Sequence, residues 1–279
     1  MNHRRHFRPS KQYGFSIVEL LVAVVISMLL LTGVIQVFFS SKQTYASNEA
    51  ASRLQENGRF ALEFIAQSAR HAGYVEAANS TTVPPNPIAT PGATNCNTPR
   101  VCSSQGAGNA SDTIGFALQP RMLEGARRDC LGNTLTGATA NTDLIINHFE
   151  IIPGANGTPS ALGCRSWNFT KGTGEWVAGP GVSPLIDGVD ALQIQYGVST
   201  SGDRNNVNQY ISADRVTALN AWNDVIAVRI AVLANSIDRV DPPAPARRYV
   251  LLDAAPTAVF DDGRARQIFT TTIKLRNTF

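Results

Sequence analysis

The chain has 279 residues, enough for one large or two small domains, and 43% hydrophobic with 16% charged residues is a globular composition of low charge density. The net charge is +3, but Arg4, Arg5, Arg8 and Lys11 lie before Gly14 and no acidic residue does. Without those four, 20 basic residues stand against 21 acidic residues, so net charge gives no support to a protein that binds nucleic acid directly.

The first predicted element is a long apolar helix that follows these basic residues. No charge lies between Leu20 and Ser41, and at about 1.5 Å per residue this range spans about 33 Å, enough to cross a hydrocarbon core of about 30 Å. The positive-inside rule then puts residues 1–14 in the cytoplasm and the rest outside. A secretory signal has a shorter apolar region, and a cleavage site near Thr44-Tyr45-Ala46 is the alternative.

Glu19 is the only charged residue between Lys11 and Lys42, and it lies at the start of the apolar range. A carboxylate in the middle of a bilayer costs about 2.5–3.5 kcal/mol, less near an interface, and such residues are usually functional. A plain signal anchor explains the basic residues and the length of the segment, but it does not explain Glu19.

The segment Gly14-Phe15-Ser16-Ile17-Val18-Glu19-Leu20 resembles the class III signal of type IV prepilins. The resemblance implies cleavage between Gly14 and Phe15 by a prepilin peptidase, N-methylation of Phe15, and retention of the apolar helix. Glu19 follows Phe15 by four residues, so both lie on one face of a helix. The resemblance assigns Glu19 to subunit assembly, where it pairs with the amine of a neighbouring subunit.

The helix pattern continues without proline to about His71, which gives a helix of about 85 Å from Phe15. Four apolar residues recur at intervals of seven, four and seven on one face: Leu54, Ala61, Ile65 and Ala72. Phe60 and Phe64 are expected to widen this stripe, and Gly33 and Gly58 to be soft points. We expect the stripe to pack on the chain's own head, with a coiled coil to another protein as the alternative.

The end of this helix carries a second resemblance. The run from Arg53 to Tyr74, SRLQENGRFAL followed by AGY, resembles the PilW family of minor pilins. This block is more specific than the cleavage motif, which all type IV pilins share.

The head begins with residues 75–110, which are rich in Pro, Asn, Thr, Ser, Ala and Gly and predict a long irregular loop. Apolar alternation then predicts five strands, over Ser111–Gln119, Asp143–Ile152, Leu192–Val198, Ile226–Val232 and Phe269–Leu275. An Asp187-Gly188 turn is expected before the third strand, and a short helix over Ser212–Asn223. Together they predict an antiparallel sheet that covers the long helix.

The head contains four cysteines, Cys96, Cys102, Cys130 and Cys164, and none has the spacing of a Cys-x2-Cys zinc site. An even number downstream of a membrane segment is typical of disulfides in an oxidising compartment. Three pairings are possible, and we favour Cys96–Cys102 with Cys130–Cys164.

The resemblance to the PilW family extends into the head through four motifs. They are Asp129–Asn133, Pro184–Val189, Gln195–Val198 and Phe269–Asn277. Residues 75–110 and 153–183 carry little of the resemblance.

No catalytic motif is present: the chain has no Gly-x-Ser-x-Gly, His-Glu-x-x-His or P-loop sequence. We expect His148 to be a packing residue rather than a ligand. Tyr45, Trp167, Trp176 and Trp222 are expected to pack in a core or interface, with recognition of a partner as the alternative. The loop Ser201–Asn208 has oxygen ligands at alternate positions, but Arg204 and Asn206 dilute it, and a solvated loop is preferred over a calcium site. We therefore expect no catalytic residue, no metal and no cofactor.

These observations predict an α+β type IV pilin fold, a long amino-terminal helix packed on an antiparallel β-sheet head. The expected parts are a leader at 1–14, a membrane and filament-core helix at 15–41, its amphipathic continuation at 42–74, and a periplasmic head at 75–279.

The resemblance implies a minor pilin that primes pilus assembly at the inner membrane and lies at or near the tip. Its implied partners are other minor pilins, the major pilin, the prepilin peptidase, the inner-membrane assembly platform and a large tip adhesin. The alternatives are a type II secretion pseudopilin, which shares the cleavage motif, a membrane-anchored binding module and a membrane-anchored enzyme.

Overall fold

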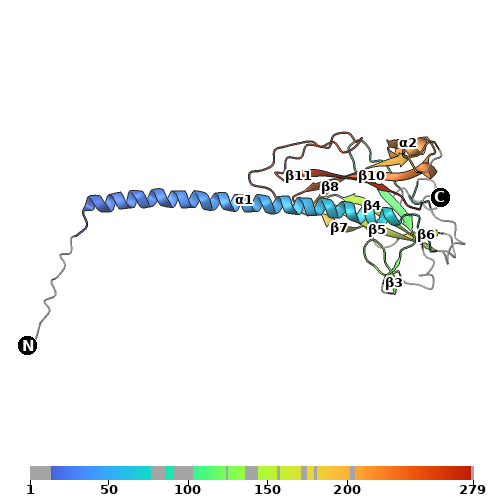
Figure 1. Cartoon of the computed structure of the whole chain (residues 1–279), viewed down its shortest axis with the longest axis horizontal. Coiled ribbons are helices and arrows are strands. Elements are labelled where there is room, and N and C mark those ends of the chain that lie inside the picture. The colour runs from blue at the N-terminus through green and yellow to red at the C-terminus, as the bar shows by residue number, and fades with distance from the viewer. Residues whose placement is uncertain are drawn as a thin grey trace, which may run out of the picture. The chain divides into compact units, whose positions relative to one another are not determined.

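The computed structural model of the chain describes residues 14–76, 86–90, 103–123, 125–135, 144–155, 158–170, 175–178, 181–201 and 205–277. The chain divides into two compact units, Met1–Ser47 and Asn48–Phe279. The described residues form one long helix and antiparallel sheets, which confirms the expected α+β class (Figure 1).

The long helix α1 runs from Ile17 to His71. It is the one helix in the described ranges that is long and apolar enough to cross a membrane, and its apolar window is not buried by the protein itself. Large apolar side chains from Ile17 to Phe39 are exposed, an arrangement that water does not favour and that lipid or neighbouring helices satisfy.

The second half of α1 buries the predicted stripe. Leu54, Ala61, Ile65 and Ala72 are each at most 6% exposed, which confirms that this face packs on the chain's own head. The expectation for Phe60 and Phe64 is wrong, because these side chains are 48% and 38% exposed. Each precedes a buried residue by one position, and one position is about 100° around a helix, so both rings point to the side of the stripe.

The head contains two main sheets. The first has the order β1 (Ile114–Leu118), β4 (Ile145–Ile152), β5 (Ala161–Thr170) and β6 (Glu175–Ala178), and β7 (Ser183–Asp187) also pairs with β5. The second has the order β11 (Arg266–Lys274), β10 (Val225–Asn235), β8 (Val189–Val198) and β9 (Gln209–Ile211). A short hairpin of β2 (Met122–Leu123) and β3 (Ala126–Arg127), the helix α2 (Ala213–Ala218) and the 3-10 turn η2 (Trp222–Asp224) complete the described elements.

The predicted Asp187-Gly188 turn is present, but the two strands that it joins do not pair with each other. β7 pairs with β5 in the first sheet, whereas β8 pairs with β10 in the second, so the chain changes sheet at Gly188. Gly188 has a φ of +77°, which favours glycine, and an added Cβ would lie 3.0 Å from the carbonyl oxygen of Asn235. The local turn is correctly predicted, but its topology depends on distant strands.

The two sheets are joined beside the start of β8. The amide of Asp112 donates to the carbonyl of Leu192, and the Asp112 carboxylate accepts from the amide of Ile194. This segment directly precedes β1, so hydrogen bonds connect β8 to the first sheet and both sheets face α1.

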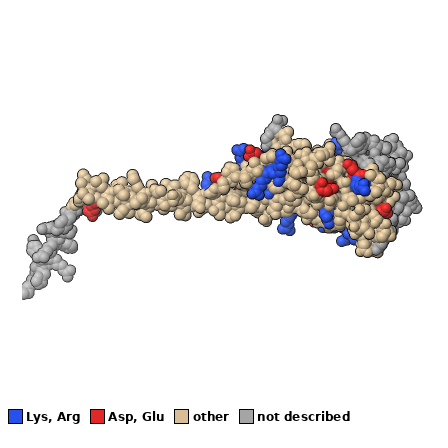
Figure 2. All heavy atoms as spheres, turned by 90° about the horizontal axis from the view of Figure 1, so that it is seen from above, with Lys and Arg blue, Asp and Glu red and all other residues tan. Residues whose placement is uncertain are grey.

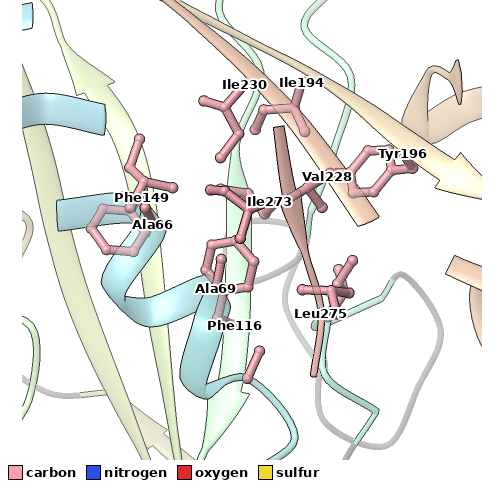
Figure 3. Packing of buried hydrophobic residues seen from close by; sticks show 14 of the residues in the cluster. Ala66, Ala69, Phe116, Phe149, Ile194, Tyr196, Val228, Ile230, Ile273 and Leu275 are labelled. Carbon is pink, nitrogen blue, oxygen red and sulfur yellow. The ribbon is translucent and has the colours of Figure 1, made fainter. Parts of the chain in front are cut away.

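The main core lies between α1 and the facing sides of both sheets. Figure 3 shows Ala66 and Ala69 of α1 turned toward Phe116, Phe149 and Ile273, which come from three different strands. A separate apolar cluster lies on the outer face of the second sheet, where Leu251 packs with Ala231 and Leu233. β10 is therefore buried on both faces, although its alternating sequence is typical of a half-buried strand.

The described parts of 75–110 are buried at 87–90 and at Ser103, whereas residues 107–110 are exposed. Ile88, Ala89 and Ser103 are at most 1% exposed, and Ile88 forms a bridge with Phe116 of β1. The amide of Ala89 donates to the carbonyl of Gly115. This segment is irregular in sequence, but its described parts extend the edge of the first sheet.

Candidate functional site

The first candidate site is the start of α1, where the sequence predicts processing. Phe15 is 85% exposed and directly precedes Ser16, whose Oγ accepts a hydrogen bond from the amide of Val18. The amide of Leu20 donates to the carbonyl of Ser16, so the helix begins within two residues of Phe15. Ser16 acts as the amino-terminal cap, which satisfies one of the free amides of the first turn.

Glu19 lies in this first turn, on the same surface as Phe15. The two side chains line a shallow hollow along the helix together with Ala23 and Ser27. A carboxylate in the first turn is stabilised by the positive end of the helix dipole, and Ser16-Ile-Val-Glu19 has the spacing of a capping box. The signal for this cap is present in the sequence as the spacing of Ser16 and Glu19, and it is additional to the features predicted for this segment.

Glu19 is also isolated in charge. Figure 2 shows one acidic group near the start of the helix, followed by a long uncharged surface. An isolated carboxylate in an apolar surround gains most from a cation supplied by another chain.

The described surroundings of Gly14 do not require glycine. Among the described residues, an added Cβ at Gly14 would meet nothing within 4 Å. No packing contact in the described part of the chain therefore explains a small residue before Phe15.

The second candidate site is the surface around the end of α1. Cys130 and Cys164 form a disulfide with a Cα–Cα distance of 6.5 Å, the pair favoured from the sequence. The disulfide links the segment between β1 and β4, which contains Cys130, to β5, which contains Cys164. Cys96 and Cys102 lie outside the described residues, and so does any pairing between them.

The Asp129–Asn133 motif forms a tight turn beside this disulfide. The Asp129 carboxylate accepts from the amides of Leu131 and Asn133 and from the hydroxyl of Ser166. Gly132 has a φ of +79°, which the turn requires. The motif is explained by the turn and its anchoring, and it supplies no free carboxylate for chemistry.

A groove of about 310 Å³ lies between this turn and the end of α1. Asn147 bridges its floor: its amide donates to the hydroxyl of Ser68 on α1, and its carbonyl accepts from the amide of Cys130. Arg128 donates to the carbonyl of Gly132, and Arg121 lies over the Tyr74 ring. These polar groups are committed to holding the loop on the helix.

The carboxyl end of α1 explains the Ala72-Gly73-Tyr74 motif. Gly73 has a φ of +75°, and an added Cβ would lie 2.5 Å from the carbonyl oxygen of Asn277. The Asn277 side chain donates to the carbonyl of Ala72, one of the free carbonyls at the helix end. The Ala72-Gly73-Tyr74 motif and the end of the Phe269–Asn277 motif, which are far apart in the sequence, therefore meet at the carboxyl end of α1.

His148 is a buried packing residue, as expected. It is 1% exposed, and neither ring nitrogen has a hydrogen-bond partner among the described residues. Burial, with a smaller effect from Arg165, lowers the pKa of His148 to about 4. Within the described ranges no three His, Cys, Asp or Glu residues gather as a metal site. The calcium-like loop falls partly at 202–204, outside the described residues.

The aromatic residues divide between core and surface. Trp167 and Trp222 are 9% and 8% exposed, and Trp222 packs edge-on against Tyr196 with ring centroids 4.9 Å apart. This confirms core packing for both, whereas Tyr45 is 72% exposed on α1. The side chain of Trp176 lies outside the described residues.

Two family models match the chain. Residues 148–277 match the model described as Type IV Pilus-assembly protein W, and residues 9–35 match the prokaryotic N-terminal methylation motif. Searches of curated proteins and of solved structures find no significant match. The second match covers Gly14, Phe15 and Glu19, and the first covers Cys164, β8, β10 and β11.

Proposed function

The chain belongs to the PilW family of type IV pilins, and from this membership we propose that it primes filament assembly with other minor pilins at the inner membrane and lies at or near the pilus tip. The coarser role is a membrane-anchored minor pilin, a structural component that interacts with other parts of the pilus. The finer role rests on the amino-terminal segment.

The observation that carries the proposal is the start of α1. An exposed Phe15, an open Gly14 and a lone Glu19 precede an apolar surface that the protein does not bury. A single-pass anchor needs only the apolar surface. A processed pilin also gives roles to the other three residues: Gly14 and Phe15 flank the cleaved bond, and Glu19 pairs with the methylated amine of a neighbouring subunit.

In the proposed mechanism, the prepilin peptidase removes residues 1–14 and the new amine of Phe15 is N-methylated. Glu19 then pairs with the amine of a neighbouring subunit in the membrane or the filament core. The pair neutralises a carboxylate that is costly in an apolar surround, so assembled subunits are favoured over isolated ones.

The proposed layout keeps the boundaries expected from the sequence. Residues 15–41 form the membrane and filament-core helix, 42–74 continue it, and 75–279 form a periplasmic head. The partners are other minor pilins, the major pilin and the assembly platform of the inner membrane, with a large adhesin at the tip.

Mass spectrometry of the membrane-extracted protein tests this proposal directly. We expect a mature chain that begins with methylated Phe15. An intact Met1 would make the protein an anchored module, and a terminus near Ser47 would make it a secreted protein; either result contradicts the proposal.

Gly14→Ala is the matched variant for this experiment. It leaves the fold unchanged, because nothing lies within 4 Å of the added methyl group, and we expect it to stop cleavage. At 29.9 kDa for 279 residues, retention of residues 1–14 adds about 1.5 kDa, which a gel resolves.

A further inference from the structure

The strand β11 forms an open edge of the second sheet. It pairs with β10 through nine consecutive residue pairs without a shift, whereas the pairing of β10 with β8 contains two shifts. In the parts of the chain that the structure describes, no strand pairs with the other side of β11. At about 3.4 Å per residue, this regular edge is about 30 Å long.

The register shows which backbone groups of β11 point outward. The amide of Leu275 donates to the carbonyl of Ile226, and that of Ser236 to the carbonyl of Ala265, just beyond each end of the paired region. Hydrogen-bonded and non-hydrogen-bonded pairs alternate in an antiparallel ladder. The odd-numbered residues of β11 therefore bond to β10, and Ile268, Thr270 and Thr272 direct their amides and carbonyls outward.

The middle of this edge lacks the usual protection against strand pairing. Proteins blunt exposed edges with proline, bulges or charged side chains, especially lysine, and the charged residues of β11, Arg266 and Lys274, lie at its two ends. β11 contains no proline and no bulge, and the three consecutive residues Thr270, Thr271 and Thr272 favour extended backbone. α1 contacts the strand where Gly58 approaches the Phe269 ring, and Thr270 and Thr272 remain exposed.

A groove of about 300 Å³ runs between α1 and β11. Its apolar lining comes from Leu62, Ala66 and Phe269, and its charged lining consists of Arg59, Glu63 and Arg70. Arg70 is paired with Glu63 at 2.7 Å, whereas Arg59 has no ion pair within the described ranges. Side chains alternate across a strand, so every second residue of a strand added to β11 would point toward this groove.

We propose that the β11 edge binds an extended segment of a different pilus subunit by strand addition. The segment places an apolar side chain against Leu62 and Ala66 and an acidic side chain near Arg59. Backbone hydrogen bonds to the outward groups of β11 supply the affinity, and the groove supplies the specificity. This inference rests on the proposed function, since it takes the partner from the pilus.

Antiparallel pairing with β11 of a second copy does not suit this edge. Such pairing relates the two copies by a two-fold axis perpendicular to the sheet, which reverses the direction of the part of α1 that packs on the head. It also places Arg59 of one copy against no acidic residue of β11 in the other, since β11 contains none. We therefore assign the edge to a strand of a different subunit.

Photo-crosslinking in the full chain tests the proposal in the bacterium that makes it. A photoreactive benzoylphenylalanine replaces the exposed Thr270, and the cross-linked peptide is identified by mass spectrometry. We expect an adduct with an extended segment of another pilin that carries an acidic residue. An adduct only with lipid, with a helix or with a second copy of this chain would overturn the proposal.

Thr272→Pro is the decisive variant, with Thr272→Val as its matched control. Proline at 272 removes an outward amide and no ladder bond, so β11 still pairs with β10, whereas valine keeps the amide. We expect about a tenfold loss of the adduct with proline and no loss with valine. An unchanged adduct in a folded proline variant would contradict strand addition.

Arg59→Glu provides a second test that does not alter the strand. Arg59 is exposed, so the fold should tolerate the change, and we expect the adduct to decrease several-fold through repulsion of the acidic residue. An undiminished adduct argues against the assigned partner chemistry. The mature amino terminus is measured in every protein. If the chain that carries only the photoreactive residue at 270 has methylated Phe15 but forms no adduct, the edge assignment alone is overturned, whereas an intact Met1 overturns the proposed function itself.

Discussion

At the scale of single residues, three glycines near or within α1 have the same conformational freedom and different surroundings. An added Cβ at Gly14 or Gly33 would meet nothing within 4 Å, but at Gly58 it would lie 2.3 Å from the Phe269 ring. Gly58 is therefore a point of close approach between the helix and β11, and not the soft point that its helix propensity predicts. The sequence does not reveal this role, because Phe269 belongs to the last strand.

Gly58→Ala is expected to destabilise the head. The methyl group overlaps the Phe269 ring, and overpacking a core typically costs about 1–3 kcal/mol. Thermal unfolding of the full chain in detergent should show a melting temperature lower by several degrees. Gly33→Ala is the control, and we expect no decrease there because the site is open; equal effects at both positions would contradict the close-packing role of Gly58.

Asp112 and His148 are buried titratable residues whose effects on stability oppose each other. Burial raises the pKa of Asp112 to about 7, so between pH 3.8 and about 7 the folded state binds more protons than the unfolded state and stability falls as pH rises. Burial lowers the pKa of His148 from 6.5 to about 4, so between those values the unfolded state binds more protons and stability rises with pH.

Replacing one of these two residues should reveal the effect of the other on the pH dependence of stability. In His148→Leu we expect the free energy of unfolding to decrease from pH 4.5 to 6.5, with a slope approaching about 1.4 kcal/mol per pH unit. In Asp112→Asn we expect it to increase over the same range. Urea unfolding at a series of pH values measures both slopes, and parallel curves for the two variants would show that these residues do not control the pH dependence.

At the scale of elements, the sequence predicts strands and helices better than their arrangement. The stripe through Leu54 and Ile65 and the alternation in β11 are local patterns, and both are confirmed. The change of sheet at Gly188 and the burial of both faces of β10 depend on residues distant in sequence, such as Asn235 and Leu251. Periodicity reports the conformation of a segment and not its neighbours.

The Cys130–Cys164 disulfide is expected to stabilise the excursion between β1 and β4. The two residues are 34 positions apart, and closing a loop of this size typically contributes about 2–4 kcal/mol. The variant Cys130→Ser/Cys164→Ser should therefore melt several degrees below the wild type. For the test with reductant, both proteins are made with Cys96 and Cys102 replaced, so that only this disulfide can be reduced. Reductant should then lower the melting temperature of the protein that keeps Cys130 and Cys164, and leave that of the Cys130→Ser/Cys164→Ser variant unchanged.

At the scale of the whole molecule, the candidate sites differ in how much of them the sequence reveals. Gly14, Phe15 and Glu19 lie within six residues of chain, so a local motif identifies them. The β11 edge is a property of the sheet order, and the groove beside it joins Leu62 of α1 to Thr270 near the end of the chain. No local pattern marks a strand as the last in its sheet.

Glu19→Ala separates processing from assembly in the intact protein. The cleaved bond lies before Phe15, and the alanine keeps the helix, so we expect the mature terminus to remain methylated Phe15. Filament incorporation should fall sharply. Glu19 is the only acidic residue between Lys11 and Lys42, so its replacement leaves the amine of a neighbouring subunit without an acidic partner in this segment. Counting pili per cell and probing sheared pili for the variant measures this loss.

Glu19→Gln distinguishes the role of the Glu19 charge from the role of the Glu19 side chain in capping the helix. Glutamine keeps a side-chain acceptor at the third helical position, where Glu and Gln both serve in a capping box, but it carries no charge. If the cap alone matters, Glu19→Gln assembles like the wild type. If the carboxylate pairs with a methylated amine, Glu19→Gln fails as Glu19→Ala does, and the charge between subunits, rather than the local helix end, explains why an acidic residue stands in the apolar segment.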